Sequence, residues 1–353
     1  MQITHILGID IAKLKFDVCL RYASPDGARQ AATFPNHAKG FLALKRWLAK
    51  HAVTRLHACL ESTSRYGDAL ALHLHQQNHL VSMVNPRRTR HSADSRLIRT
   101  QNDTIDAALI ADFCASENPR LWEPLPAAQR RLQDLVRTRA FCLNLKKQCG
   151  NRLETSDSLN AVHRRRHVRQ LKATMDKIER QMTELLAREP DLARQVKLAQ
   201  SIPGVGALTA AVAVAELPPL DRLKHAGQAV ALAGLDPRNK DSGTSVHTVP
   251  RLSKMGSPLL RQTLYMAGLV ALRHNPVVRA LGQRLQARGK GGKCAVAAAM
   301  RKLVRLIYGV LKQGQPFDPN WMQRDRAAGS GGRASGGDGR PSPQLAEPPV
   351  ATA

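Results

Sequence analysis

The chain has 353 residues, enough for two domains that each bury their own core. Hydrophobic residues make up 43%, as in globular proteins, while 54 lysines and arginines against 27 aspartates and glutamates give a formal net charge of +27. This balance predicts a polyanionic partner, most commonly nucleic acid, and argues against a membrane-surface protein because the basic residues are not confined to one amphipathic helix.

Residues 1–126 predict an α/β domain. Three consecutive strands joined by short turns are expected at 3–10, 15–22 and 29–34, followed by a helix at 38–51. Further strands are expected at 55–61 and 80–85, with a helix at 66–77 between them and a later helix that contains Asp103 and Asp106. Three strands followed by alternating helices and strands imply a mixed sheet layered with helices.

Residues 127–195 predict a helical linker with coiled-coil character. Apolar residues recur there at spacings of four and three, at Leu171, Met175, Ile178, Met182 and Leu185. The seam has two interpretations. One is an antiparallel hairpin within one chain, and the other is a contact between chains that would make the protein a homo-oligomer.

Residues 196–322 predict a mainly helical C-terminal domain. It begins with "IPGVG", in which Gly204 and Gly206 lead into an alanine-rich helix. These glycines either form a helix-hairpin-helix turn, whose backbone N–H groups face a phosphate, or simply permit close packing. Further helices are expected at 257–273, 276–288 and 292–313, and the low-complexity composition of 323–353 predicts a disordered tail.

One stretch of the C-terminal domain carries only basic charges. No acidic residue occurs between Asp241 and Asp318, whereas a solvated helical face normally mixes both signs. We therefore expect a surface that follows nucleic-acid phosphates. The candidate contacts, which include two arginines of the N-terminal domain, are Arg87, Arg88, Arg251, Lys254, Arg261, Lys290, Lys293, Arg301, Lys302 and Arg305.

The six cysteines have neither a CxxC motif nor metal-ligand spacing, so we expect reduced and mostly buried thiols. Charged residues interrupt the apolar opening of the chain, and no segment is long enough to span a bilayer. The sequence thus predicts a cytoplasmic protein, associated with the nucleoid when it acts, and no membrane partner.

Four acidic residues lie at the ends of apolar strands or on the apolar face of a helix. Asp10 ends the first strand in "ILGIDIAK", and Glu61 ends a later strand in "ACLESTS". Asp106 falls in the apolar stripe of its helix that Ile105, Leu109, Ile110 and Phe113 define, with Asp103 one turn earlier.

A buried carboxylate needs a cationic partner, and four together would repel one another. Oxygen ligands of this kind suit Mg²⁺ or Mn²⁺, and two such ions can assist phosphodiester chemistry. The alternatives are a helix cap for Asp103, an arginine partner for Asp106, and ordinary strand-end or surface acids for Asp10 and Glu61.

The motifs "GIDIAK", "CLESTS", "NDTIDA", "IPGVG", "AGLDPRNKDSGTS" and "RLSKMG" resemble those of the DEDD transposases of the insertion-sequence one-ten family, whose better-studied members are bridge-RNA-guided recombinases. The resemblance runs from residue 5 to about 318. It implies a RuvC-like (RNase H-type) N-terminal domain with Asp10, Glu61, Asp103 and Asp106 as metal ligands, a coiled-coil linker and a C-terminal transposase domain. It also implies DNA as substrate, a structured non-coding guide RNA, and a dimer or tetramer.

The resemblance further implies a catalytic serine before a glycine, which maps to Ser242 in "KDSGTS". Spacing alone does not distinguish Ser242 from Thr244 or Ser245, and a turn serine bonded to its own backbone is the alternative. A hydroxyl on a glycine-containing loop of a basic domain could attack phosphorus and form a phosphoserine link.

Other functions account for less of the sequence. An actin-like sugar kinase shares the RNase H-type fold but needs Gly/Thr-rich phosphate loops, which we do not find. A non-catalytic nucleic-acid-binding protein would not explain acids on an apolar helix face. We expect a transposase that cuts and rejoins DNA strands with metal-assisted serine chemistry. The alternative is a RuvC-type metal-dependent junction endonuclease without a covalent serine intermediate.

Overall fold

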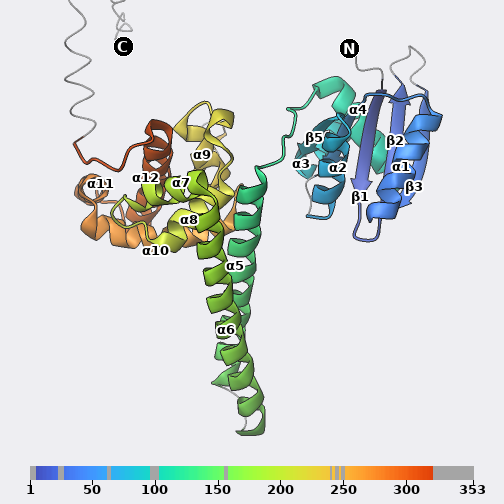
Figure 1. The fold of residues 1–353 in the computed structure, drawn as a ribbon. Coiled ribbons are helices and arrows are strands. Elements are labelled where there is room, and N and C mark those ends of the chain that lie inside the picture. The colour runs from blue at the N-terminus through green and yellow to red at the C-terminus, as the bar shows by residue number, and fades with distance from the viewer. Residues whose placement is uncertain are drawn as a thin grey trace, which may run out of the picture. The chain divides into compact units, whose positions relative to one another are not determined.

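The computed structural model describes residues 5–22, 28–61, 65–95, 103–154, 158–238, 241–242, 246–247 and 251–320. Contacts divide the chain into two compact units, Met1–Pro124 and Leu125–Ala353 (Figure 1). The helices expected as a separate linker fall within the second unit, so the four-part division remains a prediction. The expected tail at 323–353 lies outside the described residues. None of the described helices is long and apolar enough to cross a membrane.

The first unit contains a five-stranded mixed sheet in the order β3-β2-β1-β4-β5. An antiparallel meander is formed by β1 (His5–Ile11), β2 (Lys15–Tyr22) and β3 (Arg29–Pro35). The other two strands, β4 (His57–Glu61) and β5 (Leu80–Val84), run parallel to β1. Short turns suffice for the meander, whereas the parallel strands need helical crossovers. The predicted α/β domain with a mixed sheet is confirmed.

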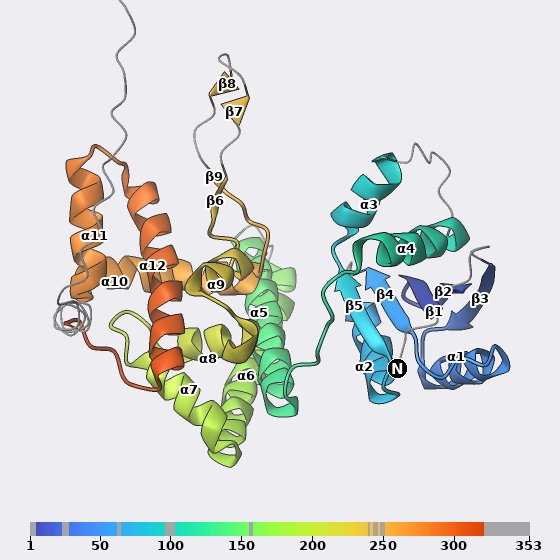
Figure 2. The same ribbon diagram turned by 90° about the horizontal axis from the view of Figure 1, so that it is seen from above.

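Helices cover both faces of this sheet (Figure 2). On one face, α1 (Ala38–Lys50) and α2 (Asp68–Gln76), which follows a 3-10 turn at Arg65–Gly67, share a core with Leu7 and Ile9 of β1. On the other face, α4 (Asp103–Glu117) packs on β1, β2 and β4. A helix that the sequence did not reveal, α3 (Pro86–Ser95), contacts α4.

Helix α4 lies very close to β1 because residue 8 is glycine. A Cβ atom on Gly8 would be 2.1 Å from the carbonyl oxygen of Ala107 and 2.4 Å from the amide nitrogen of Ala111. These separations are far below van der Waals contact, so only glycine fits. Since Gly8 precedes Asp10 by two residues and Ala107 follows Asp106, this contact sets the position of both acids.

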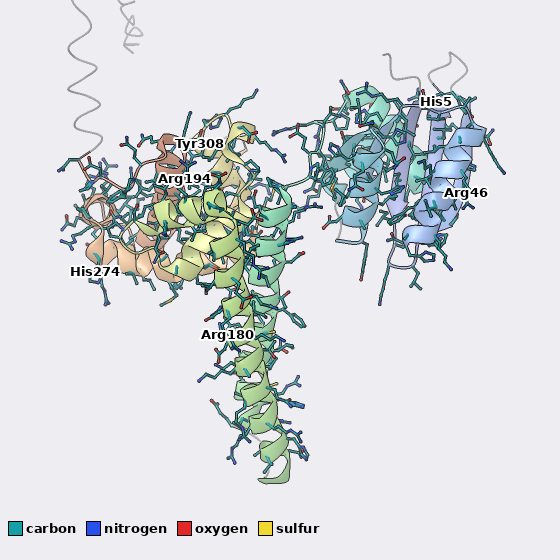
Figure 3. The ribbon with its side chains drawn as sticks, in the orientation of Figure 1. His5, Arg46, Arg180, Arg194, His274 and Tyr308 are labelled. Atoms are coloured by element: carbon teal, nitrogen blue, oxygen red, sulfur yellow. The ribbon has the colours of Figure 1, made fainter. Side chains whose placement is uncertain are left out.

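The second unit contains a long hairpin of α5 (Ala127–Leu153) and α6 (Ser158–Arg188), which lie side by side (Figure 1). Met175, Ile178 and Met182 of α6 are buried in the same core as Leu132 and Val136 of α5. Exposed positions carry charges such as Arg180, which Figure 3 labels. The heptad seam is therefore used within one chain, and it no longer provides a reason to expect a contact between chains.

The hairpin joins a helical core. Its helices are α7 (Pro190–Gln200), α8 (Ala207–Glu216), α9 (Ala226–Leu232), α10 (Pro258–His274), α11 (Pro276–Ala287) and α12 (Gly292–Gln313). A short 3-10 turn, Leu220–Arg222, precedes α9. Every residue from Ala210 to Ala215 is buried, because the small side chains of α8 let the helices α5, α7 and α10 pack closely around it. In the turn before α8, Gly204 has φ +98° and packs against Ala271 of α10, so this glycine serves close packing.

A buried ionic cluster ties the hairpin to this core. The Glu216 side chain, 4% exposed, accepts hydrogen bonds from Arg137 Nε at 2.7 Å and Arg137 Nη2 at 3.1 Å. Ser257 Oγ donates to the same carboxylate at 2.8 Å and accepts from the Leu260 amide as the N-cap of α10. Because the buried carboxylate is fully paired, it can be accommodated and fixes α5, α8 and α10 relative to one another.

The contact at Gly8 predicts a large effect of a small substitution. In Gly8→Ala the added methyl group should push α4 away from β1, so the free energy of unfolding should fall by roughly 1–3 kcal/mol or more. Gly67→Ala is the control, since a Cβ atom there meets only ordinary contacts, Ile11 at 3.4 Å and Leu60 at 3.9 Å. Denaturant unfolding of the full chain measures both, and equal stability of the two variants would contradict the tight contact.

The hairpin seam predicts a contrast between two apolar positions. Met182→Ala should lower the free energy of unfolding by roughly 2–5 kcal/mol because it leaves a cavity between α5 and α6. Phe141→Ala on α5 should change it by less than about 0.5 kcal/mol, because Phe141 is 62% exposed. Unfolding followed by circular dichroism at 222 nm measures both, and a stronger effect at Phe141 would indicate a further apolar contact there.

Candidate active site

Two of the four predicted acids lie side by side at the carboxyl ends of neighbouring parallel strands. Ile9 of β1 is in register with Leu60 of β4, so Asp10 and Glu61 follow on adjacent strands. Adjacent strands are about 4.8 Å apart. Both acids are half-buried, and side-chain alternation gives them the sheet face that Gly8 and Cys59 occupy, which is the face covered by α4.

The other two acids belong to the first turn of α4. The helix begins at Asp103, and Asp106 is half-buried beside a buried face formed by Ala107, Ile110, Ala111, Phe113 and Cys114. Ile105 and Leu109, which helical spacing predicts on that face, are only half-buried. The side chain of Asp103 lies outside the described residues. Because Gly8 touches Ala107, the first turn of α4 lies beside the end of β1 that carries Asp10.

The described part of the chain does not contain three His, Cys, Asp or Glu side chains grouped closely enough to hold a metal ion. Asp10, Glu61 and Asp106 therefore share one end of the interface between α4 and the sheet without converging on one point. The ligand type nevertheless fits a metal site, because Mg²⁺ and Mn²⁺ prefer oxygen donors such as these three carboxylates, which come from three separate elements.

A fifth acid, Asp17, adjoins this set and was not singled out from the sequence. It lies on β2 directly opposite Asp10 in the antiparallel register and is 6% exposed. Its carboxylate pairs with Lys15 Nζ at 3.1 Å and accepts a hydrogen bond from Thr33 Oγ1. Opposed like charges are unfavourable in a sheet, and these two partners offset the charge of Asp17. The signal in the sequence was an aspartate inside the apolar run "FDVCL".

Thr89 of α3 is a second residue that sequence reasoning missed. Its side chain is buried, and Thr89 Oγ1 donates a hydrogen bond to Glu61 Oε1. The same hydroxyl lies 2.9 Å from the carbonyl oxygen of Pro86, one turn earlier in the helix. Thr89 thus restricts the orientation of the Glu61 carboxylate. A lone threonine in a polar segment carries no signal of this role.

A buried pair of thiols lies next to Glu61, on the sheet face that α4 covers. Cys59 of β4 and Cys114 of α4 hydrogen-bond to each other, which raises the pKa of Cys59; burial acts in the same direction. The hydrogen bond with Cys59 lowers the pKa of Cys114, and a hydrogen bond with His57 adds to this effect. Four of the six cysteines, Cys19, Cys59, Cys114 and Cys142, are buried, as expected from the sequence.

Ser242 lies in the second unit, in a pair of short antiparallel ladders. β6 (Pro237–Arg238) pairs with β9 (Arg251–Leu252), and β7 (Asp241–Ser242) pairs with β8 (Val246–His247), farther from α9 (Figure 2). The loop expected around Ser242 is thus partly strand, with Ser242 opposite Val246. Its side chain, and the neighbouring Thr244 and Ser245, lie outside the described residues.

The predicted nucleic-acid contacts divide into two groups. Some contact other groups of the protein. The exposed Arg88 guanidinium lies over the Phe113 ring at 5.3 Å, and Nη1 of the half-buried Arg261 donates to the carbonyl oxygens of Ala233 and Lys254. Others project from the surface, including Arg87, Arg251, Lys290, Lys293 and Arg305.

Cations of α11 and α12 are crowded together. The pKa of the half-buried Lys302 is lowered by burial and then by the positive charges of Arg305 and Arg284. Nearby, Arg301 Nε is buried without a hydrogen-bond partner in the described structure. Removal of cations from water beside other cations favours an anion at this surface.

Comparison with known proteins relates both units to transposases. Residues 7–156 match the DEDD transposase domain of IS110, and residues 196–283 match the "Transposase IS116/IS110/IS902 family". The chain is 31% identical to the pilin gene-inverting protein of Moraxella bovis over 321 residues, which cover 90% of this chain and 98% of that protein. The homologue from Moraxella lacunata has the same identity and coverage.

A shorter match relates the chain to an insertion element. It is 28% identical over 163 residues to an uncharacterised protein of insertion element IS110 from Streptomyces coelicolor, covering 46% of this chain and 37% of that protein. The family matches fall on both units, and the similarity to the Moraxella proteins extends over nearly the whole chain. The chain therefore belongs to the IS110 family of DEDD transposases and is a DNA recombinase.

Proposed function

We propose that the protein cuts and rejoins the DNA ends of an insertion sequence with four acids of the first unit and Ser242 of the second. The observation that carries this proposal is the register of β1 and β4. It sets Asp10 beside Glu61 at the carboxyl ends of parallel strands, next to the first turn of α4. Ligands and reactive groups commonly gather at such ends.

In this proposal Asp10, Glu61, Asp103 and Asp106 hold Mg²⁺ or Mn²⁺. The metal would supply Lewis acidity at the scissile phosphate. Thr89 restrains Glu61, while Lys15 and Thr33 offset the charge of Asp17, so the sheet tolerates a further acid next to Asp10. The sheet order β3-β2-β1-β4-β5, with three antiparallel and two parallel strands, supports assignment to the RuvC-like (RNase H-type) class.

Ser242 Oγ is proposed to attack the phosphorus while the bond from phosphorus to a deoxyribose oxygen breaks, and that oxygen takes up a proton and leaves as a free hydroxyl. The resulting phosphoserine link would conserve the energy of the broken bond, so the strand could be rejoined by reversal. A serine hydroxyl is a weak nucleophile and must lose its proton to a base. We assign this activation to the four acids, contributed by the same chain or by another protomer of a dimer or tetramer.

We also propose that an element-encoded non-coding RNA guides the choice of DNA sites. The support is the absence of acidic residues between Asp241 and Asp318, together with the crowded cations of α11 and α12. A surface of one charge sign binds phosphates without reading sequence, so sequence choice would have to come from another component.

Loss of one metal ligand should abolish cleavage. Asp10→Asn and Asp106→Asn should each lower the rate of DNA strand cleavage on the order of 10⁴-fold, because an amide cannot replace a carboxylate at a divalent cation. The measurement is cleavage of labelled element-end DNA in Mg²⁺ or Mn²⁺, with and without EDTA.

Asp112→Asn is the matched control on the same helix, because Asp112 pairs with Arg29 at 3.0 Å and Arg21 at 3.6 Å instead. It should cleave within about threefold of the unmodified protein. Cleavage that persists in EDTA, or in Asp10→Asn, would contradict the proposed role of the acids.

Removal of the serine should separate binding from covalent chemistry. Ser242→Ala should bind DNA normally but form no protein–DNA adduct on denaturing gels, whereas Ser245→Ala should form the adduct as before. Recombination by Ser242→Ala at the unmodified rate would favour the junction endonuclease. A mixture of Ser242→Ala with Asp10→Asn that regains activity would assign the acids and the serine to different protomers.

A further inference from the structure

A concave pocket lies between α10, α11 and α12 of the second unit, and neither a candidate acid nor Ser242 is among the residues that line it. Its volume is about 540 Å³, within the range of small-ligand sites. Leu269 and Leu272 of α10 and Val296 of α12 give it an apolar lining. Gly282 also lines the pocket. A Cβ atom at this position would lie only 2.7 Å from the Leu272 side chain. Figure 2 shows the three helices, and His274, labelled in Figure 3, marks the C-terminal end of α10.

The charged residues that line the pocket are both cations. They are Arg279 of α11 and Lys293 of α12. Arg279 Nε, at 3.0 Å, and Arg279 Nη2 both donate to the carbonyl oxygen of Arg273, which fixes the guanidinium and leaves its remaining N–H groups available. None of the residues that line the pocket is acidic, and no acidic residue occurs from 242 to 317 of the sequence. The occupant should therefore carry negative charge.

The uncharged lining indicates what else the occupant contains. Tyr265 lines the pocket with its side chain 48% exposed, so the ring is accessible to a planar group. Gln283 and Gln286 contribute two side-chain amides, which donate and accept hydrogen bonds as base edges do. A planar group with hydrogen-bonding edges, an apolar face and an attached negative charge is a nucleotide.

We propose that this pocket binds a single unpaired nucleotide of the nucleic acid, with its base stacked on Tyr265 and its phosphate at Arg279 and Lys293. A base within a duplex is already stacked on both sides, so only an unpaired or extruded base can enter. The inference rests on the proposed function only in taking nucleic acid as the partner. It adds recognition of unpaired positions, which a uniformly basic surface does not provide.

The test compares fully paired duplexes with duplexes of the same sequence that carry one unpaired pyrimidine, in DNA and RNA versions, with the full chain. The unmodified protein should bind the bulged form more tightly. Tyr265→Ala should weaken binding of the bulged form roughly 5- to 150-fold, the usual contribution of one stacked base, and leave the paired form unchanged. Fluorescence anisotropy measures each dissociation constant.

Two matched variants separate stacking from general damage. Tyr265→Phe keeps the ring and should bind the bulged form within about twofold of the unmodified protein. Met266→Ala changes the next residue, which is 62% exposed and does not line the pocket, and should have no effect. Since Tyr265 is half-exposed, unfolding curves of all three variants should coincide.

A second measurement locates the base directly. Irradiation of probes with 5-iodouracil at the unpaired position should yield a cross-link to Tyr265 or to another residue of the pocket, identified by mass spectrometry. A preference for the RNA probe would assign the pocket to a guide RNA, and a preference for the DNA probe to the element or its target; either result supports the proposal.

Equal loss of paired and bulged binding in Tyr265→Ala, no preference for the bulge, or a cross-link outside α10–α12 would overturn it. Failure of the unmodified protein to bind even the paired duplexes would instead count against the proposed function.

Discussion

Helix α4 can lie on strand β1 only because residue 8 has no side chain. The contact between Gly8 and the backbone of Ala107 brings the first turn of α4 to the strand end that carries Asp10, and the parallel register then adds Glu61. Catalytic carboxylates must be held within a fraction of an ångström, and two rigid elements in backbone contact meet this requirement better than loops. A catalytic centre here would depend on a residue that takes no part in the reaction.

In the second unit, polar contacts fix the hairpin of α5 and α6 to the helical core. The fully paired Glu216 carboxylate connects Arg137 of α5 with Ser257, the cap of α10. Gln129 reinforces this connection, since Gln129 Nε2 donates to the carbonyl oxygens of Val214 and Leu217 at 2.7 Å. These polar contacts specify one orientation of the hairpin on the core, whereas apolar packing alone would permit sliding.

The local pattern of apolar and polar residues was sufficient to predict most helices and strands, because alternation and helical spacing are properties of neighbouring residues. The position of Asp17 opposite Asp10 and the bond from Thr89 to Glu61 depend on residues far apart in the chain, so no local pattern could reveal them. The α6 seam indicated an apolar partner but not which helix provides it. The strand at Ser242 is two residues long, too short for any periodicity to predict.

In the acid-free segment from 242 to 317, cations lie close to one another when no nucleic acid is bound. Repulsion among cations such as Arg284, Lys302 and Arg305 raises the free energy of the folded chain, and dissolved ions screen that repulsion. Salt also weakens the binding of phosphates by competing for the same cations. Ionic strength therefore acts in opposite directions on the free protein and on its complex. At low salt, a polyanion bound to these cations would replace the missing counterions and so stabilise this part of the fold.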